Sequence, residues 1–310
     1  MIMKTSTFIL SITTASLLPS MLLNVAIADE QRFSWQGKLE AGYLYDSNVT
    51  VRELDTTTNE SDQAVQLKGS VSLKWNPWAN LNLNTGVNHS ETLYQSQDEF
   101  DLAITTIHGD LSYDFSEITV GVSRHDATAD LADQAFMDYQ QDALYLARLW
   151  GTRWYTRVAV QNIEKSFNQV PDRNATAEAI VGDVYWFTPS AKSFVMLGYT
   201  YHDETATNPE LSYQEPQYRL TWQSQTSGWG GEHTWQIHLQ WQQRDYLAPM
   251  QILDGSTREE QRLTARAQWD IPLTSGFKFT PSIEYVDNQS NFADVDYDET
   301  LAGIRLSYTF

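Results

Sequence analysis

Apolar and polar residues alternate along most of this chain with a period of two. The pattern is clearest in residues 65–75, where odd-numbered positions are apolar or glycine and even-numbered positions are polar. Successive side chains of a β-strand point to opposite faces, so such a segment has one apolar and one polar face. Strands of this length are typical of a transmembrane barrel, with lipid on one side and a water-filled lumen on the other.

The same alternation recurs down the chain and predicts an all-β fold, a transmembrane antiparallel up-and-down β-barrel of about fourteen strands. Segments 101–115 and 175–188 alternate less cleanly, so twelve to sixteen strands remain open. In residues 234–241 we expect the even-numbered polar side chains to face the lumen. The predicted strands are 34–46, 64–76, 80–94, 101–115, 117–127, 137–150, 153–166, 175–188, 192–203, 214–226, 233–245, 259–272, 276–287 and 297–310.

Connections of two lengths separate these segments. Tight turns alternate with longer acidic connections, which is the asymmetry between periplasmic turns and outer loops in bacterial barrels. Ten of the eleven Trp residues lie near the predicted tight turns, Trp241 being the exception, and many Tyr residues lie near the long loops. Aromatic rings prefer the headgroup depth of a membrane, so this segregation predicts two girdles. The predicted long loops are 47–63, 127–136, 204–213 and 246–258.

The N-terminus predicts export. Lys4 is followed by a mostly apolar stretch, residues 8–25, and then by Ala26-Ile27-Ala28. This pattern is typical of a signal peptide cleaved after Ala28, which divides the chain into a signal, 1–28, and a barrel, 29–310. Only residues 29–33 precede the first strand, so we expect neither a plug nor a periplasmic module ahead of the barrel. The chain has no Cys, which excludes lipoprotein acylation and disulfides.

Composition fits a barrel in the outer membrane of a Gram-negative bacterium. Mean hydropathy is only −0.45, because alternate residues of each strand face water. No segment after the signal approaches the ~20 consecutive apolar residues of a membrane helix. The net charge of −20 argues against nucleic-acid binding, which requires basic patches. Lipid and lipopolysaccharide are therefore the expected surroundings.

Charged residues of both signs should line the lumen. The basic ones come mainly from the first two and last three predicted strands, which become neighbours when the barrel closes. One interpretation is a pore lining that selects an anionic solute. The other is that any polar lumen must be filled with mutually paired side chains, and this second interpretation is the simpler. The pore-lining candidates are Lys38, Lys68, Lys74, Arg262, Arg266, Lys278, Arg305, Glu40 and Glu284, with Asp110 and Asp270 also facing inward.

Two further sets of side chains are weak chemical candidates. Asp294, Asp296 and Asp298 share one face if the chain is extended there, which is a possible cation site, but a solvated acidic rim is the simpler interpretation. His125-Asp126 and His202-Asp203 are adjacent residues on strands, so their side chains point to opposite faces and form no catalytic pair. We expect no enzyme activity and no cofactor.

Two stretches resemble a known family. Gly42-Tyr43-Leu44-Tyr45-Asp46-Ser47-Asn48-Val49 is similar to the Tyr-Asp-Ser-Asn-Val signature of a group of proteobacterial outer-membrane barrels. The tail, with Tyr285, residues 288–291, Asp296-Tyr297-Asp298 and a final Phe310, resembles the C-terminal barrel of surface lipoprotein assembly modifiers. That resemblance implies a fourteen-stranded barrel that helps lipoproteins to the cell surface, here without the family's periplasmic helical-repeat domain. The terminal Phe resembles the signal that barrel-assembly machinery recognises.

Three functions follow as alternatives. A porin-like channel for small, anionic solutes is the first choice because of the basic lumen wall and the expected absence of a plug. A barrel that assists transport of a secreted or lipidated protein is the second, because of the family resemblance. A structural or adhesive, non-conducting barrel is the third, because of the acidic loops.

Overall fold

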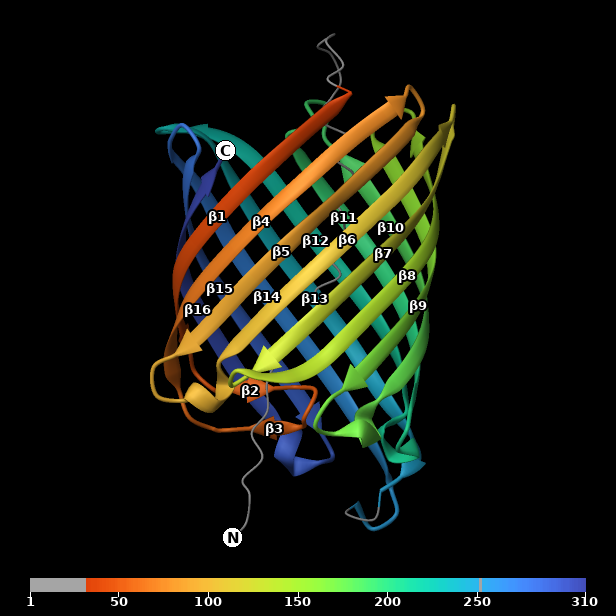
Figure 1. Cartoon of the computed structure of the whole chain (residues 1–310), viewed down its shortest axis with the longest axis vertical. Helices are drawn as coiled ribbons and strands as arrows, with labels where there is room; N and C mark the ends of the chain where they lie inside the picture. The colour runs from red at the N-terminus through yellow and green to blue at the C-terminus, as the bar shows by residue number, and fades with distance from the viewer. Residues whose placement is uncertain (1–31, 251–252) are drawn as a thin grey trace.

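The computed structural model describes residues 32–250 and 253–310, and these form a closed antiparallel barrel (Figure 1). Fourteen strands of the described chain build its wall, as the alternation predicts. The signal peptide and its cleavage after Ala28 lie outside the described residues. The wall strands are β1 (Phe33–Asp46), β4 (Asp62–Trp78), β5 (Leu81–Tyr94), β6 (Leu102–Phe115), β7 (Ile118–Leu131), β8 (Gln134–Trp150), β9 (Trp154–Phe167), β10 (Ala175–Phe187), β11 (Ser193–Ala206), β12 (Tyr213–Gly228), β13 (Gly231–Pro249), β14 (Thr257–Thr274), β15 (Phe277–Ser290) and β16 (Tyr297–Thr309).

Each strand pairs with its neighbours in sequence, and β1 pairs with β16 to close the barrel. The predicted tight turns lie at one end, called the inner end here, together with the start of β1 and the end of β16 (Figure 1). The other connections lie at the outer end, and several of them contain short 3-10 turns, η2 (Asp98–Phe100), η3 (Pro171–Arg173), η4 (Pro209–Leu211) and η6 (Ala293–Val295). The long loop predicted for residues 127–136 is wrong, because β7 and β8 continue through it and are joined by a two-residue turn, Ala132-Asp133, with positive φ at both residues. Among the residues described, no helix is long and apolar enough to span a membrane.

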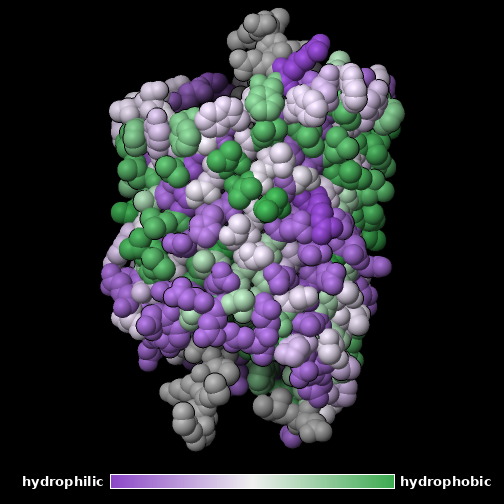
Figure 2. All heavy atoms as spheres, in the orientation of Figure 1, coloured by the Kyte–Doolittle hydropathy of each residue, from purple (hydrophilic) through white to green (hydrophobic). Residues whose placement is uncertain are grey.

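Alternation assigns the two faces of the wall. On β4, the apolar side chains Val65, Leu67, Val71 and Trp75 are exposed on the outside, and polar residues between them face the lumen. On the face in view in Figure 2, apolar residues lie mainly in the inner half of the barrel, and hydrophilic residues dominate the outer end. Trp residues flank the tight turns as expected, and Trp235 stacks on Trp269 at 4.5 Å between ring centroids.

The two segments with weak alternation are complete strands, β6 and β10. The reason is visible in β10, whose lumen-facing residues Ala177, Ala179, Val181 and Tyr185 are apolar and buried. A strand with apolar residues on both faces cannot show period-two hydropathy. One element was not predicted, a small ribbon of β2 (Thr50–Val51) and β3 (Thr56–Thr57) within the first long loop.

The C-terminal residue completes the seam between β1 and β16. The Phe310 N–H donates to the Gly37 carbonyl at 3.0 Å, and the Gly37 N–H donates to the Phe310 carbonyl at 2.9 Å. The Phe310 ring lies against Gly37, where a side chain would collide with it, and it contacts Trp35 and Tyr308. Glycine at 37 therefore provides the space in which the ring rests.

Removing Phe310 should weaken the seam more than removing its ring. Deletion loses two backbone hydrogen bonds, about 1 kcal/mol each, and two aromatic contacts of about 0.5–1.5 kcal/mol each. Phe310→Ala loses only the contacts. Urea unfolding of the refolded protein in vesicles should give the order wild type, Phe310→Ala, deletion. Equal stability of the deletion and the alanine variant would show that the terminal hydrogen bonds do not hold the seam.

Candidate functional site at the outer mouth

The loop between β1 and β4, residues 47–61, folds into the outer mouth of the barrel, and Asn48 organises its base. The Asn48 side-chain oxygen accepts hydrogen bonds from the Thr57 hydroxyl at 2.7 Å and the Asn59 N–H at 2.9 Å. Its amide donates to the Asp298 carbonyl on β16, and Asp46 accepts the Asn48 N–H at 3.0 Å. The Tyr-Asp-Ser-Asn-Val stretch is thus the turn that directs the loop inward.

The apolar side of the loop is anchored by two valines. Val49 and Val51 are fully buried against the lumen faces of β6 to β10. Burying one valine contributes about 1.5–3 kcal/mol. This contact accounts for the apolar lumen-facing residues Leu102 of β6 and Ala177 of β10. Val181 and Tyr185 of β10 belong to a second apolar cluster. The wall and η2 residues of the cluster around Val49 and Val51 are Phe100, Leu102, Ala127, Ala129, Phe136, Met137, Tyr139, Ile163, Phe167 and Ala177.

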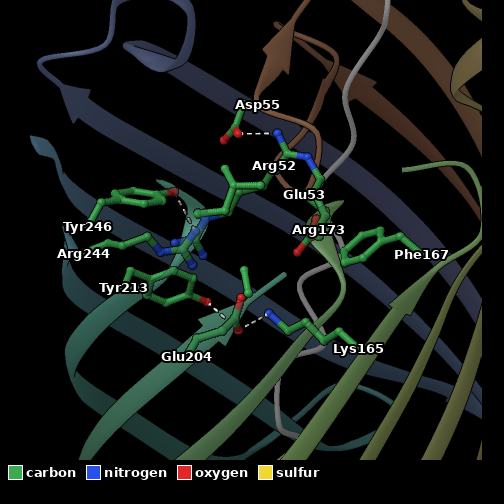
Figure 3. A pocket seen from close by; sticks show the side chains of 12 residues that line it. Arg52, Glu53, Asp55, Lys165, Phe167, Arg173, Glu204, Tyr213, Arg244 and Tyr246 are labelled. Carbon is green, nitrogen blue, oxygen red and sulfur yellow. Dashed lines mark hydrogen bonds and ion pairs between the residues drawn. The ribbon is translucent and has the colours of Figure 1, made fainter. Parts of the chain in front are cut away.

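The charged side of the loop is anchored to the opposite wall and to η3. Arg52 forms an ion pair with Glu215 of β12 at 3.0 Å, and the same carboxylate binds Arg244 of β13 at 2.9 Å. Asp55 binds Arg258 of β14 at 2.6 Å and Arg173 of η3 at 2.5 Å. Figure 3 shows four members of this network, Arg52, Asp55, Arg173 and Arg244, among the side chains around one cavity. The loop therefore crosses the mouth and is held on several sides.

Little space remains between the loop and the wall. Glu204 of β11 accepts hydrogen bonds from the Tyr213 hydroxyl at 3.0 Å and binds Lys165 at 2.7 Å. Around this group and the ion pairs of the loop, a cavity of only about 40 Å³ is left (Figure 3). A second cavity, beside Arg258, measures about 10 Å³. Such volumes hold a few water molecules and no organic solute.

The Asp55 carboxylate has an unusual pKa. Burial alone would raise it, but the hydrogen bond and charge of Arg258, together with the charge of Arg173, outweigh burial and lower the pKa of Asp55 to about 2. The carboxylate is thus held ionised by two guanidinium groups from separate elements. Protonation of Asp55 would therefore weaken the ion pairs that anchor the loop.

The predicted basic wall exists, and most of its charges are paired. Glu40 lies beside Lys38 at 3.0 Å and Arg305 at 2.8 Å, and it is opposite Lys68 in the β1–β4 register. Arg266 pairs with Glu284 across β14 and β15. These six residues come from the five strands that the sequence places side by side.

The other predicted lumen residues occupy different places. Lys278 pairs with Asp270 at 2.9 Å near the inner end, whereas Lys74 has no ion pair within the part of the chain that is described. Arg262 lies on the lumen face of β14 nearer the outer end, where it donates to the Tyr297 hydroxyl at 2.7 Å. Asp110, on the opposite wall, accepts a hydrogen bond from the Tyr145 hydroxyl at 3.0 Å.

The acidic run near the C-terminus does not form a joint face. Asp294 lies in the 3-10 turn η6, so the chain is not extended there, and Asp298 lies on the outside of β16. No group of three or more potential metal ligands occurs in residues 32–250 and 253–310. His125 stacks on His108 inside the barrel, while Asp126 pairs with Arg124 outside. Adjacent residues are thus separated by the wall, as expected.

The expectation that neither a plug nor a periplasmic module precedes the first strand stays a prediction, because residues 1–31 lie outside the described residues. The loop that folds into the mouth was not predicted from the sequence, and the residues that anchor it were missed. Arg52, Asp55, Glu215 and Arg258 are far apart in sequence, so spacing alone could not pair them. Two local signals were present. Val49-Thr50-Val51 is apolar within an otherwise acidic loop, and β10 is apolar on the face that should meet water.

Replacing Asp55 by Asn should release the loop. The change leaves two guanidinium groups without their carboxylate, and breaking a buried ion pair costs about 3 kcal/mol. In planar bilayers, we expect Asp55→Asn to conduct more often than wild type at pH 7. Asp98→Asn, an exposed carboxylate in η2, is the control and should behave as wild type. Equal conductance of wild type and Asp55→Asn would show that this anchor does not hold the loop.

Acid should release the wild-type loop in a defined range. The pKa of Asp55 in the folded state, about 2, is below its ordinary value of 3.8. The stabilisation is therefore complete above about pH 4 and is lost as pH falls toward 2. Wild-type conductance should rise over this interval, whereas Asp55→Asn should lack that response.

Comparisons with known proteins agree with this architecture. Two solved barrels share the fold: an anion-selective porin from Comamonas acidovorans (7% identity, 90% of this chain and 99% of that chain, TM-score 0.51) and outer-membrane expressed OmpT of Vibrio cholerae (9% identity, 92% and 100%, TM-score 0.54). Among curated proteins, none matches the sequence significantly. The sequence profile of surface lipoprotein assembly modifiers matches residues 35–310. The chain is an outer-membrane-type barrel and belongs to the surface lipoprotein assembly modifier family.

Proposed function

We propose that this protein is a gated outer-membrane barrel that assists the surface assembly of a lipoprotein, with residues 47–61 as the gate. The observation that carries the proposal is the loop ion-paired across the mouth, from Arg52 to Glu215 and from Asp55 to Arg258. The loop and its ion pairs cross the route that a small solute would take through a continuously open porin. Membership of the family supplies the class of cargo.

The anchors of the loop suit a gate. Polar pairs such as Arg52–Glu215 can exchange for water or for charged groups of a cargo, whereas a fully apolar plug would be released at greater cost. The buried side chains of Val49 and Val51 supply an apolar contact, which holds the loop in place while the gate is closed. Opening then needs a cargo that competes for the arginines or for the carboxylates. A polypeptide carrying charges of both signs meets that requirement.

The proposal is tested in the bacterium that carries this gene. Lipoproteins are labelled with radioactive palmitate, and intact cells are treated with external protease. We expect at least one lipoprotein to be cleaved in cells with the wild-type protein and protected in cells that lack it. A variant without residues 50–57, produced at the same level in the outer membrane, should change the amount exposed. An identical set of cleaved lipoproteins with and without the protein would exclude this function.

A solute channel is the second candidate, supported by the basic wall. Lys68 and Lys74 face the lumen, and neither has an ion pair within 4 Å among the residues described. If the wild type conducts steadily at pH 7 with a preference for anions, the double variant Lys68→Gln/Lys74→Gln should reduce that preference. Selectivity is measured as the reversal potential in a salt gradient. A wild-type protein that stays closed until Asp55 is replaced argues for the gate instead.

A further inference from the structure

The outside of β7 and β8 carries charged side chains at mid-strand, where most other strands present apolar residues to lipid. Arg124 pairs with Asp126 at 2.8 Å and with Asp142 at 3.3 Å, and all three side chains are 42–56% exposed. His89 and Glu91 on β5 form a similar exposed pair. Figure 2 shows hydrophilic residues reaching from the outer end to about mid-height of the face in view, with apolar residues on both flanks.

Positions at matching distance from the inner end are apolar on the far wall. Arg124 lies six residues beyond the inner end of β7, and Asp142 lies eight residues from the inner end of β8. On β13, the corresponding positions are Ile237 and Leu239, both exposed on the outside. The apolar belt is therefore narrower on β7 and β8 than on β13.

A tilt of the whole barrel cannot accommodate this difference, because charges also fix the inner edge of the belt. Glu117, in the turn before β7, is 70% exposed and pairs with Arg148 of β8. Raising this side until Arg124 clears the bilayer would draw Glu117 and Arg148 into the hydrocarbon, at a cost of several kcal/mol. Glu117 and Arg148 thus mark the inner edge of the belt at β7 and β8, and Arg124 and Asp142 mark its outer edge.

The distance between these edges is short. A tilted strand rises about 2.5 Å per residue along the barrel axis. From Glu117 to Arg124 the belt is thus about 17 Å tall, and from Arg148 to Asp142 about 15 Å tall, by this rise. On β14, apolar residues continue from Leu263 to Leu273, about 25 Å, which is the usual height in outer-membrane barrels.

We propose that the bilayer is locally thinned beside β7 and β8, where the outer headgroup layer and its water descend to Arg124 and Asp142. Headgroups and water are the occupant because the patch is continuous with the hydrophilic outer end in Figure 2, which headgroups and water already cover. Arg124 binds two carboxylates and the Gln140 side chain at 3.0 Å. One guanidinium and two carboxylates give this cluster a net charge of −1, and it is half exposed, so it needs a hydrated surface. Mismatch of this kind is accommodated by deforming the bilayer.

Thinning changes what can occur at this side of the barrel. A shorter hydrocarbon layer lowers the cost of moving a polar group or a headgroup across it. Glu117 immediately precedes β7 and Arg124 lies within it, so both edges of the shortened belt, and the whole thinned bilayer between them, lie beside this one strand. This inference does not depend on the cargo or on the gate.

The absence of Cys from the chain permits a direct test. Single cysteines at Asp142 and Leu239 are labelled with an environment-sensitive fluorophore, and each protein is refolded into dioleoylphosphatidylcholine vesicles. We expect the label at 142 to emit at longer wavelength and to be quenched several-fold more strongly by iodide than the label at 239. Brominated acyl chains should quench the label at 239 preferentially. Pure lipid vesicles contain no protein partner, so equal lipid burial at the two positions would overturn the proposal.

Two further positions protect the test against a folding defect or a tilt. Leu144→Cys and Ile237→Cys, each six residues from the inner end of its strand, leave the ion pairs intact. The label at 144 should lie at the interface and that at 237 in the hydrocarbon. A label at Glu117→Cys should stay accessible to iodide. Acyl-chain quenching at 117, with iodide quenching at 142, would mean that the barrel tilts and that the bilayer is not thinned.

Discussion

Backbone hydrogen bonding in lipid is the constraint on which this structure depends. Water is absent from the hydrocarbon layer, so every N–H and C=O of a spanning segment needs a partner within the protein. Fourteen strands meet that need only because β1 and β16 join. The last residue takes part, since Phe310 and Gly37 exchange both of their backbone hydrogen bonds across the seam.

A closed wall of this size leaves a lumen that must be filled or wet. On the side of β1, β4 and β14 to β16 it is lined by paired charges such as Glu40 and Arg305. On the side of β6 to β10 the outer part of the lumen is lined by apolar residues, and Val49 and Val51 of the first loop cover them. The loop and the apolar lining are thus complementary, since neither would be stable against water without the other.

The outer surface is as uneven as the lumen. The belt is tall on β13 and β14 and short on β7 and β8, although both sides have the same inner edge. The short side carries its charges in pairs, Arg124 with Asp142 and Arg148 with Glu117. The wall around β7 and β8 therefore has an apolar contact with the loop inside and a short belt outside, whereas the wall around β13 and β14 has the full belt.

The sequence by itself determined the barrel, its number of strands and the face on which each strand residue lies, but it ended β7 too early and began β8 too late. Alternation is a local property, so residues 65–75 specify β4 without reference to any other segment. It also placed Lys38, Lys68 and Arg305 on one wall, because the first and last strands of a closed barrel are neighbours. The family signature near Asp46 and the terminal Phe could be recognised for the same reason, because each is a short, continuous stretch of sequence.

Only the tertiary structure decided the path of the loop and the partners of its charges. Asp55 meets Arg173 and Arg258 because the loop turns inward at Asn48, and no spacing in the sequence records that turn. Alternation placed Arg262 on the lumen face of β14 but gave neither its height near the outer end nor its partner Tyr297, since alternation fixes the face of a residue but not its height relative to other strands. Periodicity reports which side of a wall a side chain occupies, whereas contacts across a lumen depend on how that wall is closed and filled.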